Sequence, residues 1–564
     1  MMRAHLLLLL LAAGFSIQAQ ITAFQYSSVK KSTGKNGAVV SAHPLASQAG
    51  LLMLKKGGNA VDAAIAAQWA LAVVYPGAGN IGGGGFMVAS LKNKKPVALD
   101  YRETAPAGAS RDMYLDADGN PVSEKSLYGH LSAGVPGTVA GLFASHRFAK
   151  LPMQVLIQPA IDLAEKGFLI TEAEARALNH SREAFEKYNT QIPVLVKPAG
   201  WKKGDTLVQK DLAKTLKRIK SNGVKGFYEG TTAQLIVEEM KRGNGLISLE
   251  DLKNYKAKFR EAKHFNYRGY HIIGMPMPSS GGLLLTQMLK MIEPYPIGKM
   301  GFQTGASVQL MIEAERRAYA DRAKYMGDAD FYKVPVAELS DNTYLRNRMK
   351  DYQPGKAGNS TTTVEGFVPG YESEETTHLS VTDNQGNAVS VTTTLNNNYG
   401  SKTVVAGAGF LLNDEMDDFS AKPGSPNLFG AVGGKANAIE PGKRMLSSMA
   451  PTIVLKNNKP FLVIGTPGGT TIPTSVFQTI VNIIDFKMTT DDAVNQPKFH
   501  HQWLPDEVFV ESKFSPQTRQ QLHKMGYTIK ERGQIGRTEV IKVLANGRFE
   551  AVADHRGDDS ASTW

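Results

Sequence analysis

The 564-residue chain contains no cysteine. This absence excludes disulfides, thiolate-bound zinc, iron–sulfur clusters and a cysteine nucleophile. The chain also lacks a run of about 18 apolar residues, the length that a membrane-spanning helix needs. Aromatic residues make up only 8% of the sequence, but 42% of it is hydrophobic, which is close to the globular average. The composition therefore predicts a folded protein with a sizeable core and excludes general disorder.

The formal net charge is +12, from 64 basic and 52 acidic residues. The excess lies in residues 1–375 and is spread through helical segments such as 202–225, without a single basic tract. This distribution predicts a solvated surface and disfavours a nucleic-acid-binding protein.

The N-terminus has the features of a secretory signal peptide. Arg3 and His5 precede the apolar run Leu6–Ala13, and small residues follow up to Ala19. A basic start, a short apolar middle and a small residue before the cut are typical of this signal. We therefore expect a signal peptide at 1–19, a mature chain starting near Gln20, and export to the periplasm or the medium without a membrane span.

A glycine-rich segment follows the first predicted helix, residues 47–76. Residues 82–85 are four consecutive glycines, and a predicted strand begins at Phe86. The order helix–glycines–strand, without a following Gly-Lys-Ser/Thr, disagrees with a phosphate loop, which runs from strand to helix. Close backbone packing in the core is the better interpretation.

The middle of the chain, from about 135 to 350, is predicted to be mostly helical. Amphipathic runs occur at 154–166, 211–221, 232–242 and 305–323, and a turn-rich stretch interrupts them at 275–282. Residues 354–375 are rich in Gly, Ser and Thr and poor in large apolar groups, so we expect an exposed, mobile connector.

The pattern after the connector predicts a β-hairpin over residues 376–394. The residues alternate on both sides of Asn384-Gln385-Gly386, and Gly386 suits the left-handed position of a three-residue loop. If Asp383 pairs with Asn387, the residue numbers of any two cross-strand partners in the hairpin add up to 770. Leu379 then faces Val391, and Thr376 faces Thr394.

A threonine between a connector and a buried strand suggests nucleophilic chemistry. A cut before Thr376 would leave a free α-amine beside its hydroxyl, and such an amine titrates near pH 8. The amine could therefore take the proton of the hydroxyl, as in the threonine–amine variant of nucleophilic catalysis. On the pattern alone, a plain hairpin rich in threonine remains the alternative, and the spacing does not choose between Thr376 and Thr377 as the nucleophile.

Ordered motifs along almost the whole chain resemble the gamma-glutamyltranspeptidase (glutathione hydrolase) family. They are NAVDAAIA, GNIGGGGFM, LDYRETAP, GHLSAGVPGTVAGL, MPSSGG, TTHLSVTDNQGNAVSVTTTLNNNYG, LLNDEMDDFSAKPG, KRMLSSMAPTIV, GTPGG and FHHQWLPDE.

The resemblance implies an α+β fold, a four-layer αββα sandwich of the N-terminal nucleophile hydrolase type. It also implies a precursor that cuts itself between Glu375 and Thr376 into a large subunit, 20–375, and a small subunit, 376–564, which together form one αββα unit. The hydroxyl of Thr376 would attack the preceding carbonyl, and Thr394 matches the threonine that hydrogen-bonds the nucleophile.

The substrate-binding residues are also carried over from the resemblance. Arg102 matches the arginine that holds the α-carboxylate of the γ-glutamyl group, with two parallel hydrogen bonds. Asp418 matches the carboxylate that receives the α-ammonium, assisted by Asn396 and Glu415. Without the resemblance, the acidic run 414–418 could suggest a calcium site, but its spacing fits no known loop.

The remaining motifs complete the expected pocket. Ser447 and Ser448 match the pair that also binds the carboxylate, although Met445 stands where proline is commoner in relatives. Gly468 and Gly469 match the glycines whose N–H groups stabilise the oxyanion. Residues 423–438 match the lid loop of bacterial members, with Phe429 as the aromatic residue that closes over the substrate.

Three histidines are predicted to be structural. His378 shares a face with Thr376 in the hairpin, but the α-amine already supplies the base. His500 and His501 would point apart on an extended strand, so no metal site is expected there.

The sequence thus predicts an exported, self-processing gamma-glutamyltransferase and glutathione hydrolase that needs no cofactor. The expected donors are glutathione and other γ-glutamyl compounds, and the acceptors are water, amino acids or dipeptides. Two alternatives stay open: a relative acting on poly-γ-glutamate or β-lactam acyl groups, and an unprocessed binding protein with the same fold.

Overall fold

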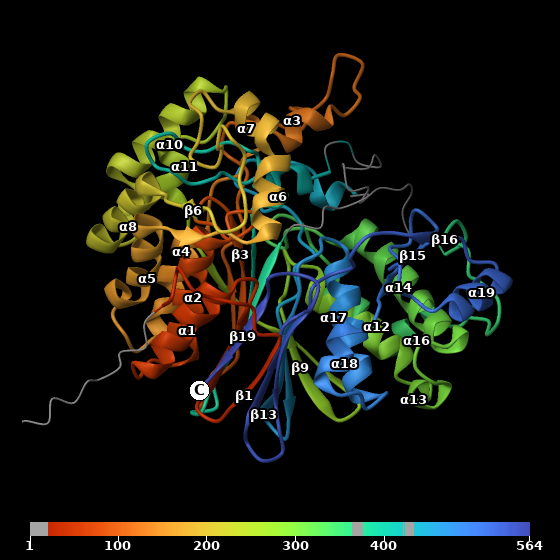
Figure 1. Ribbon diagram of the computed structural model, residues 1–564. Helices are drawn as coiled ribbons and strands as arrows, with labels where there is room; N and C mark the ends of the chain where they lie inside the picture. Colours follow the sequence, from red (N-terminus) through yellow and green to blue (C-terminus); the bar gives the residue numbers. More distant parts are fainter. Residues whose placement is uncertain (1–20, 364–375, 421, 423–433) are drawn as a thin grey trace, which may run out of the picture.

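Two seven-stranded sheets stacked face to face organise the molecule, as the computed structural model shows (Figure 1). The structure describes residues 21–363, 376–420, 422 and 434–564. The predicted signal peptide at 1–19 and most of the connector lie outside the described residues. Within the described part, no helix combines the length and the apolar character needed to cross a membrane.

Sheet I contains the predicted hairpin at its centre. Its strands, in spatial order, are β19 (Ser560–Thr563), β2 (Gly37–Ser41), β10 (Thr377–Asp383), β11 (Ala388–Thr394), β3 (Gly84–Ser90), β4 (Val97–Asp100) and β7 (Lys258–Arg260). Strands from both sides of position 376 are therefore neighbours in one sheet, so the expected large and small subunits share it.

Sheet II packs against the other face of this hairpin. Its order is β1 (Lys31–Gly34), β18 (Phe549–Val552), β17 (Glu539–Val543), β13 (Lys459–Gly465), β12 (Thr452–Lys456), β9 (Tyr270–Gly274) and β8 (Lys263–Tyr267). Two smaller sheets are formed by β14 (Phe499–His500), β15 (Val508–Val510) and β16 (Ile529–Glu531), and by β5 (Phe168–Leu169) and β6 (Thr206–Leu207).

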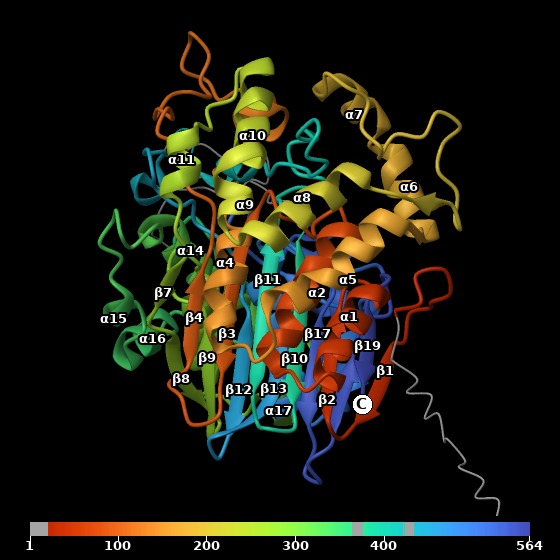
Figure 2. The same ribbon diagram turned by 90° about the vertical axis from the view of Figure 1, so that its left-hand side faces the viewer.

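Helices cover both outer faces of the two sheets (Figures 1 and 2). Beside and above sheet I lie α1 (Pro44–Lys55), α2 (Ala60–Val74), α3 (Ser123–Leu127), α4 (Thr138–Ser145), α5 (Met153–Lys166), α6 (Glu172–His180), α7 (Arg182–Tyr188), α8 (Lys210–Asn222), α9 (Lys225–Tyr228), α10 (Gly230–Arg242) and α11 (Leu249–Asn254). On the side of sheet II lie α12 (Gly281–Ile292), α13 (Ile297–Met300), α14 (Gly305–Tyr325), α15 (Val336–Leu339), α16 (Asn342–Arg348), α17 (Thr471–Ile484), α18 (Thr490–Asn495) and α19 (Pro516–Met525). The layers follow the predicted order αββα.

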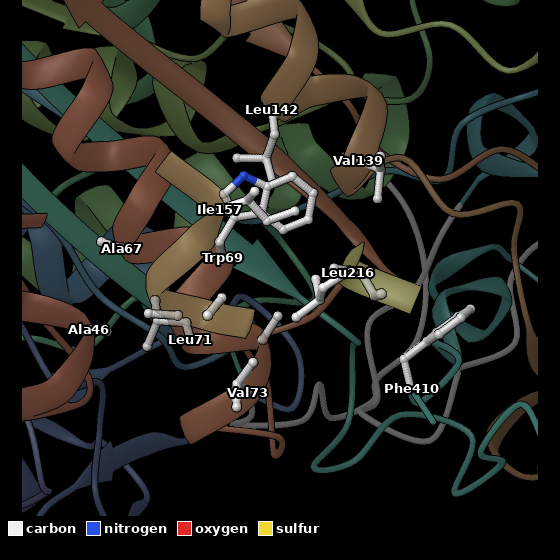
Figure 3. Close-up of a cluster of buried hydrophobic side chains, with 14 of the residues drawn as sticks. Ala46, Ala67, Trp69, Leu71, Val73, Val139, Leu142, Ile157, Leu216 and Phe410 are labelled. Atoms are coloured by element: carbon white, nitrogen blue, oxygen red, sulfur yellow. The ribbon is translucent and has the colours of Figure 1, made fainter. Parts of the chain in front are cut away.

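Separate hydrophobic cores lie on the two faces of sheet I. The apolar face of the hairpin, with Leu379, Val381, Val389 and Val391, packs against α1 and α2. Figure 3 shows the part of this core around Trp69 of α2, whose indole N–H contacts the sulfur of Met153 at 3.4 Å. The opposite face of the hairpin is polar and meets sheet II, where Ser380 and Ser390 donate to backbone carbonyls at 3.2 and 3.1 Å.

Several sequence-based expectations need correction. The helix predicted at 47–76 is two helices, because Gly57 adopts a left-handed φ of 88° and separates α1 from α2. The region 135–350 also supplies β7, β8 and β9 to the two main sheets. The helix predicted at 305–323 has no solvent face from Ser307 to Arg322, all of which are buried.

The upstream part of the connector is also not exposed throughout. Ser360 and Thr363 are only 1% and 4% exposed. Their burial has a cause in the fold, because the side chain of Trp503 donates to the carbonyl oxygens of both residues. Residues 364–375 lie outside the described residues.

The glycine-rich segment is packed as predicted. A Cβ atom added at Gly83 would lie 2.2 Å from the carbonyl oxygen of Thr394, and one at Gly82 would lie 2.1 Å from that of Leu411. Only glycine allows the backbone to approach this closely. The glycines therefore bring β3 against the end of β11, where the predicted site lies.

Candidate active site

Nearly all of the described candidate residues line one small cavity, with a volume of about 20 Å3. They come from segments between positions 102 and 472, so the fold brings together residues that are far apart in sequence. The lining residues are Arg102, Thr376, Thr394, Asn396, Glu415, Asp418, Ser447, Ser448, Met449, Gly469 and Ile472.

The hairpin places the two threonines at the cavity. The observed pairs include Thr377 with Thr393 and Leu379 with Val391, which confirms the register summing to 770. Thr376 and Thr394 are the next positions along the two strands, and their exposed fractions are 5% and 3%. Gly386 has the predicted left-handed φ of 87° in the loop.

The loop after β11 is fixed by hydrogen bonds around Thr394. The backbone N–H of Asn396 donates to Oγ1 of Thr394 at 2.8 Å, and the side chain of Asn80 donates to the carbonyl oxygen of Thr394 at 2.8 Å. Asn396 has a φ of 77°, a conformation that asparagine adopts more readily than most residues. The chain therefore turns sharply here and directs the Asn396 segment into the site.

Arg102 is buried at the base of the cavity, with an exposed fraction of 1%. Its guanidinium lies 2.5 Å from the carboxylate of Glu415 and forms a charge-assisted hydrogen bond with Asp418. It also donates to the carbonyl oxygens of Met445 and Leu446 at 3.4 Å. A buried guanidinium needs such partners, because an unpaired charge in the interior is very costly.

Acidic groups outnumber Arg102 in its immediate surroundings. Burial raises the pKa of Glu415 and Asp418, although the charge of Arg102 opposes the shift in both. Glu103, next to Arg102, is completely buried, and burial raises its pKa to about 8. Burial thus favours the protonated form of these carboxyl groups, and the site offers both a cation and acids to a ligand.

The acidic run 414–418 does not form one cluster. Glu415 and Asp418 face the cavity. Asp414 accepts the backbone N–H of Asn397 at 3.0 Å, and burial raises its pKa to about 7, whereas Asp417 accepts from the hydroxyl of Ser126 at 2.5 Å. Among the described residues, no group of three or more acidic or histidine side chains is arranged to hold a metal ion.

The serine pair is held by the turn that precedes α12. Ser447 donates its N–H to the carbonyl oxygen of Pro278 at 2.9 Å, and its own carbonyl accepts from the backbone and side chain of Ser280. The hydroxyl of Ser448 accepts a hydrogen bond from Arg322 of α14 at 3.0 Å. The MPSSGG motif thus supports the KRMLSSM motif directly.

Gly468 and Gly469 form the turn that leads into α17. Gly469 lines the cavity with Thr376, whereas Gly468 lines a neighbouring cavity of about 250 Å3. Gly468 has a φ of 134°, and a Cβ atom there would lie 2.4 Å from the hydroxyl of Thr471. The turn stands at the positive end of a helix, a suitable environment for developing negative charge.

The three histidines discussed above are buried and hydrogen-bonded. His378 contacts the hydroxyls of Thr392 and Ser380 at 2.9 and 3.1 Å, and burial lowers its pKa to about 3. His500 contacts Thr474 at 2.9 Å, and His501 contacts Asp506 at 3.2 Å. These side chains are neutral at physiological pH and hold neighbouring strands and loops.

Two predicted residues, Glu375 and Phe429, lie outside the described residues. Four further residues at the site were not predicted from the sequence: Glu103, Arg322, Met449 and Ile472. Glu103 stands next to Arg102 in the LDYRE motif, and Met449 follows the serine pair, so the motifs carried a signal for both. Arg322 lies in a polar helix that resembles a surface helix, and nothing local indicated its role.

Comparison with known proteins identifies the family. The family profile described as Gamma-glutamyltranspeptidase matches residues 46–564. The chain belongs to this family. It is 47% identical to the glutathione hydrolase proenzyme of Escherichia coli (strain K12) over 528 residues, which cover 93% of this chain and 91% of that protein. The resemblance found in the sequence is thereby confirmed.

Solved structures extend the likeness to the fold. The crystal structure of Helicobacter pylori gamma-glutamyltranspeptidase is 45% identical, with a TM-score of 0.56, over 60% of this chain and 96% of that chain. A cephalosporin acylase from Bacillus halodurans is 26% identical, with a TM-score of 0.82, over 96% of this chain and 98% of that chain. The predicted αββα fold of the N-terminal nucleophile hydrolase type is confirmed.

Proposed function

We propose that this enzyme cuts itself between Glu375 and Thr376 and then transfers γ-glutamyl groups from glutathione or related compounds. The observation that carries the proposal is the shared cavity, in which a threonine at the start of a strand meets Arg102 and two carboxyl groups. A γ-glutamyl group presents an α-carboxylate and an α-ammonium, so a site with one cation and neighbouring acids complements both.

Binding would rearrange the ion pairs of the empty site. The substrate α-carboxylate would accept from Arg102, with help from Ser447 and Ser448. The α-ammonium would donate to Asp418, Glu415 and the side chain of Asn396. Each charged group of the site then keeps a partner, which limits the cost of breaking the pairs that Arg102 makes in the empty site.

Catalysis would follow the chemistry of an N-terminal threonine. The free α-amine of Thr376 would take the hydroxyl proton, and the oxygen would attack the γ-carbonyl. The N–H groups of Gly468 and Gly469 would stabilise the oxyanion, and Thr394 would orient the nucleophile. The departing amine would take the proton back, and water, an amino acid or a dipeptide would resolve the ester.

Maturation would use the same hydroxyl before the amine exists. Attack on the carbonyl of Glu375 would give an ester that water hydrolyses, leaving a large subunit, 20–375, and a small subunit, 376–564. The two chains would be roughly 39 and 20 kDa by simple proportion of chain length. The N-terminal segment supports export to the periplasm or medium after removal of a signal peptide. Phe429 would belong to a lid over the glutamyl group.

Two substitutions at Thr376 test the central step. Thr376→Ala removes the attacking oxygen, so the purified protein should run as one uncut chain and release no chromophore from a γ-glutamyl anilide. Thr376→Ser keeps an oxygen but loses the methyl group that restricts χ1, so it should cut more slowly and keep some activity. Normal cleavage of the alanine variant would show that an outside protease does the cutting. Wild-type assays with and without glycylglycine would separate transfer from hydrolysis.

A further inference from the structure

The helix α14 is polar and yet buried, which ordinary packing does not require. Five of its polar side chains recur at intervals of three or four residues and so form a continuous stripe that winds partway around the helix. We call them the polar face of α14: Gln309, Glu313, Arg316, Tyr319 and Arg322. From Gln309 to Arg322 the helix rises about 20 Å, at about 1.5 Å per residue.

The first two residues of this face hold the chain just upstream of the expected cleavage site. The side chain of Gln309 donates to the carbonyl oxygens of Gln353 and Lys356 at 2.9 and 2.8 Å. Glu313 accepts the backbone N–H of Gly358 at 3.1 Å. A Cβ atom at Gly358 would lie only 2.4 Å from the Glu313 carboxylate, so the chain rests directly on the helix.

Arg316 continues this contact at Ser360. Its guanidinium donates to the hydroxyl of Ser360 and to Asp506, while Asp506 also accepts the backbone N–H of Ser360 at 2.8 Å. Ser360 donates to the carbonyl oxygen of Trp503 at 2.6 Å, and the indole of Trp503 donates back to Ser360 and Thr363 at 3.0 and 3.2 Å. Ser360 is therefore anchored through both its backbone and its side chain.

The other end of the polar face reaches the catalytic cavity. The hydroxyl of Tyr319 donates to the carbonyl oxygen of Thr470, the residue after Gly469. Arg322 donates to the hydroxyl of Ser448. Thr470 also donates to Gln502 at 2.8 Å, and Gln502 directly precedes Trp503. The anchor of Ser360 and the glycine turn are thus joined both through α14 and through the segment 502–503.

We propose that the polar face of α14 is a positioning device for self-cleavage, which holds residues 353–363, upstream of Thr376, at a fixed place relative to the Gly468–Gly469 turn. The proposal rests on the proposed function. Thirteen peptide steps separate Thr363 from Thr376, against 27 steps from Met349, just after α16. Releasing the whole anchored segment would lengthen the loop that ends at Thr376 from 13 to 27 steps. The larger closure entropy of the longer loop would by itself slow self-cleavage roughly threefold.

The test separates cleavage from catalysis. Full-length chains made by cell-free translation are chased, and the appearance of the two subunits is followed on gels. The double variant Ser360→Ala with Trp503→Phe removes the side-chain hydrogen bonds that hold Ser360 and Thr363 but leaves those made by Gln309 and Glu313. It should therefore cut about 1.5-fold more slowly, less than the roughly threefold expected for release of the whole segment. Once cut, it should hydrolyse a γ-glutamyl anilide with wild-type kcat and KM, because neither residue lines the cavity.

A second variant acts at the other end of the polar face. Tyr319→Phe removes the hydrogen bond to Thr470, next to the turn that both reactions would use. It should slow self-cleavage and lower the kcat of the mature enzyme, each by about two- to tenfold, which is the change in rate expected when one neutral hydrogen bond is lost. The matched control is Tyr344→Phe, which removes a 2.9 Å hydrogen bond to Asp321, elsewhere on α14. The control should change neither rate.

The outcomes distinguish this inference from the proposed function. Wild-type cleavage kinetics in the double variant, or an equal loss in Tyr344→Phe and Tyr319→Phe, would overturn the positioning role. A double variant that cuts slowly and also has a lower kcat once mature would overturn it too, because the defect would then be general. Thr376→Ala, run in parallel, reports on the proposed function alone: if it stays uncut while the double variant cuts normally, only the positioning role is lost.

Discussion

The helices α2 and α14 are both buried, one in each helical layer, but they are built from opposite kinds of residue. All 15 residues of α2 are buried, and only Asp62 and Gln68 among them are polar. In α14, the buried residues include Glu313, Glu315, Arg316, Arg317, Asp321 and Arg322. A helix that is apolar all round is expected in a core, whereas a buried polar helix needs a specific partner for each charge.

The difference shows what each helix contributes. Apolar packing is non-directional and depends mainly on volume, so α2 stabilises sheet I without fixing the position of any loop. Hydrogen bonds and ion pairs are directional, so α14 determines where its partners lie. Among its partners are the chain at 353–360, the Thr470 turn and Ser448, which belong to the site or its approach.

The largest effect expected in this comparison is on stability, in α2. Trp69→Ala leaves a cavity in the core drawn in Figure 3 and should cost about 3–5 kcal/mol of unfolding free energy. Urea unfolding measures the loss, with the exposed Leu249→Ala as a control that should stay within about 0.5 kcal/mol of wild type. The folded fraction of the Trp69→Ala variant should still cut itself and hydrolyse substrate at the normal rates. A lower kcat would show that α2 also acts on the site.

The hairpin and the site motifs could be predicted from the sequence. The alternation at 376–394 and the loop glycine fix the register, because a slip of one residue would turn Leu379 and Val381 from the core with α1 and α2 to the polar face against sheet II. The family motifs supplied Arg102, Asp418 and the serine pair, which share one cavity in the structure. Local pattern and motif suffice where a residue's role depends on its neighbours in the chain.

The role of α14 could not be predicted in the same way. Its charges follow the pattern of a surface helix, and burial becomes visible only when partners more than 100 positions away, such as Asp506 and Ser448, are in place. The anchoring of Ser360 was missed for the same reason: a segment rich in Gly, Ser and Thr is typical of a mobile linker. Long-range polar partners override these local signals.

A smaller effect, dependent on pH, is expected from α14. Glu315 is buried, and burial raises its pKa well above the usual value of 4.5, although it accepts the backbone N–H of His501 at 2.9 Å. The folded state therefore holds a proton that the unfolded state has lost above about pH 4.5. The stability from this proton is complete below pH 4.5 and decreases as pH rises toward the folded-state pKa.

Glu315→Gln keeps an oxygen acceptor but cannot ionise. The variant should match wild type near pH 4.5 and be more stable than wild type at pH 8, which melting temperatures at the two pH values would show. Glu183→Gln, at an exposed position on α7, should leave the difference between the two pH values unchanged. A Glu315→Gln profile parallel to that of wild type would mean that other buried acids govern the pH dependence.

The smallest expected difference lies at the helix ends, where the two helices should behave alike. The side chain of Asn59 accepts the N–H groups of Val61 and Asp62 at 2.8 and 3.2 Å, and Thr304 accepts that of Ser307 at 3.3 Å. Capping satisfies backbone donors that every helix has, whatever its side chains.

Asn59→Ala and Thr304→Ala should therefore each cost about 1 kcal/mol of unfolding free energy, measured by urea unfolding. Asn59→Ala should cost slightly more, because its side chain also donates to the carbonyl oxygen of Phe148 at 2.8 Å. Neither variant should change the rate of self-cleavage. If Thr304→Ala slows cleavage while Asn59→Ala does not, the positioning role of α14 extends to its first turn, and the polar face alone does not explain it.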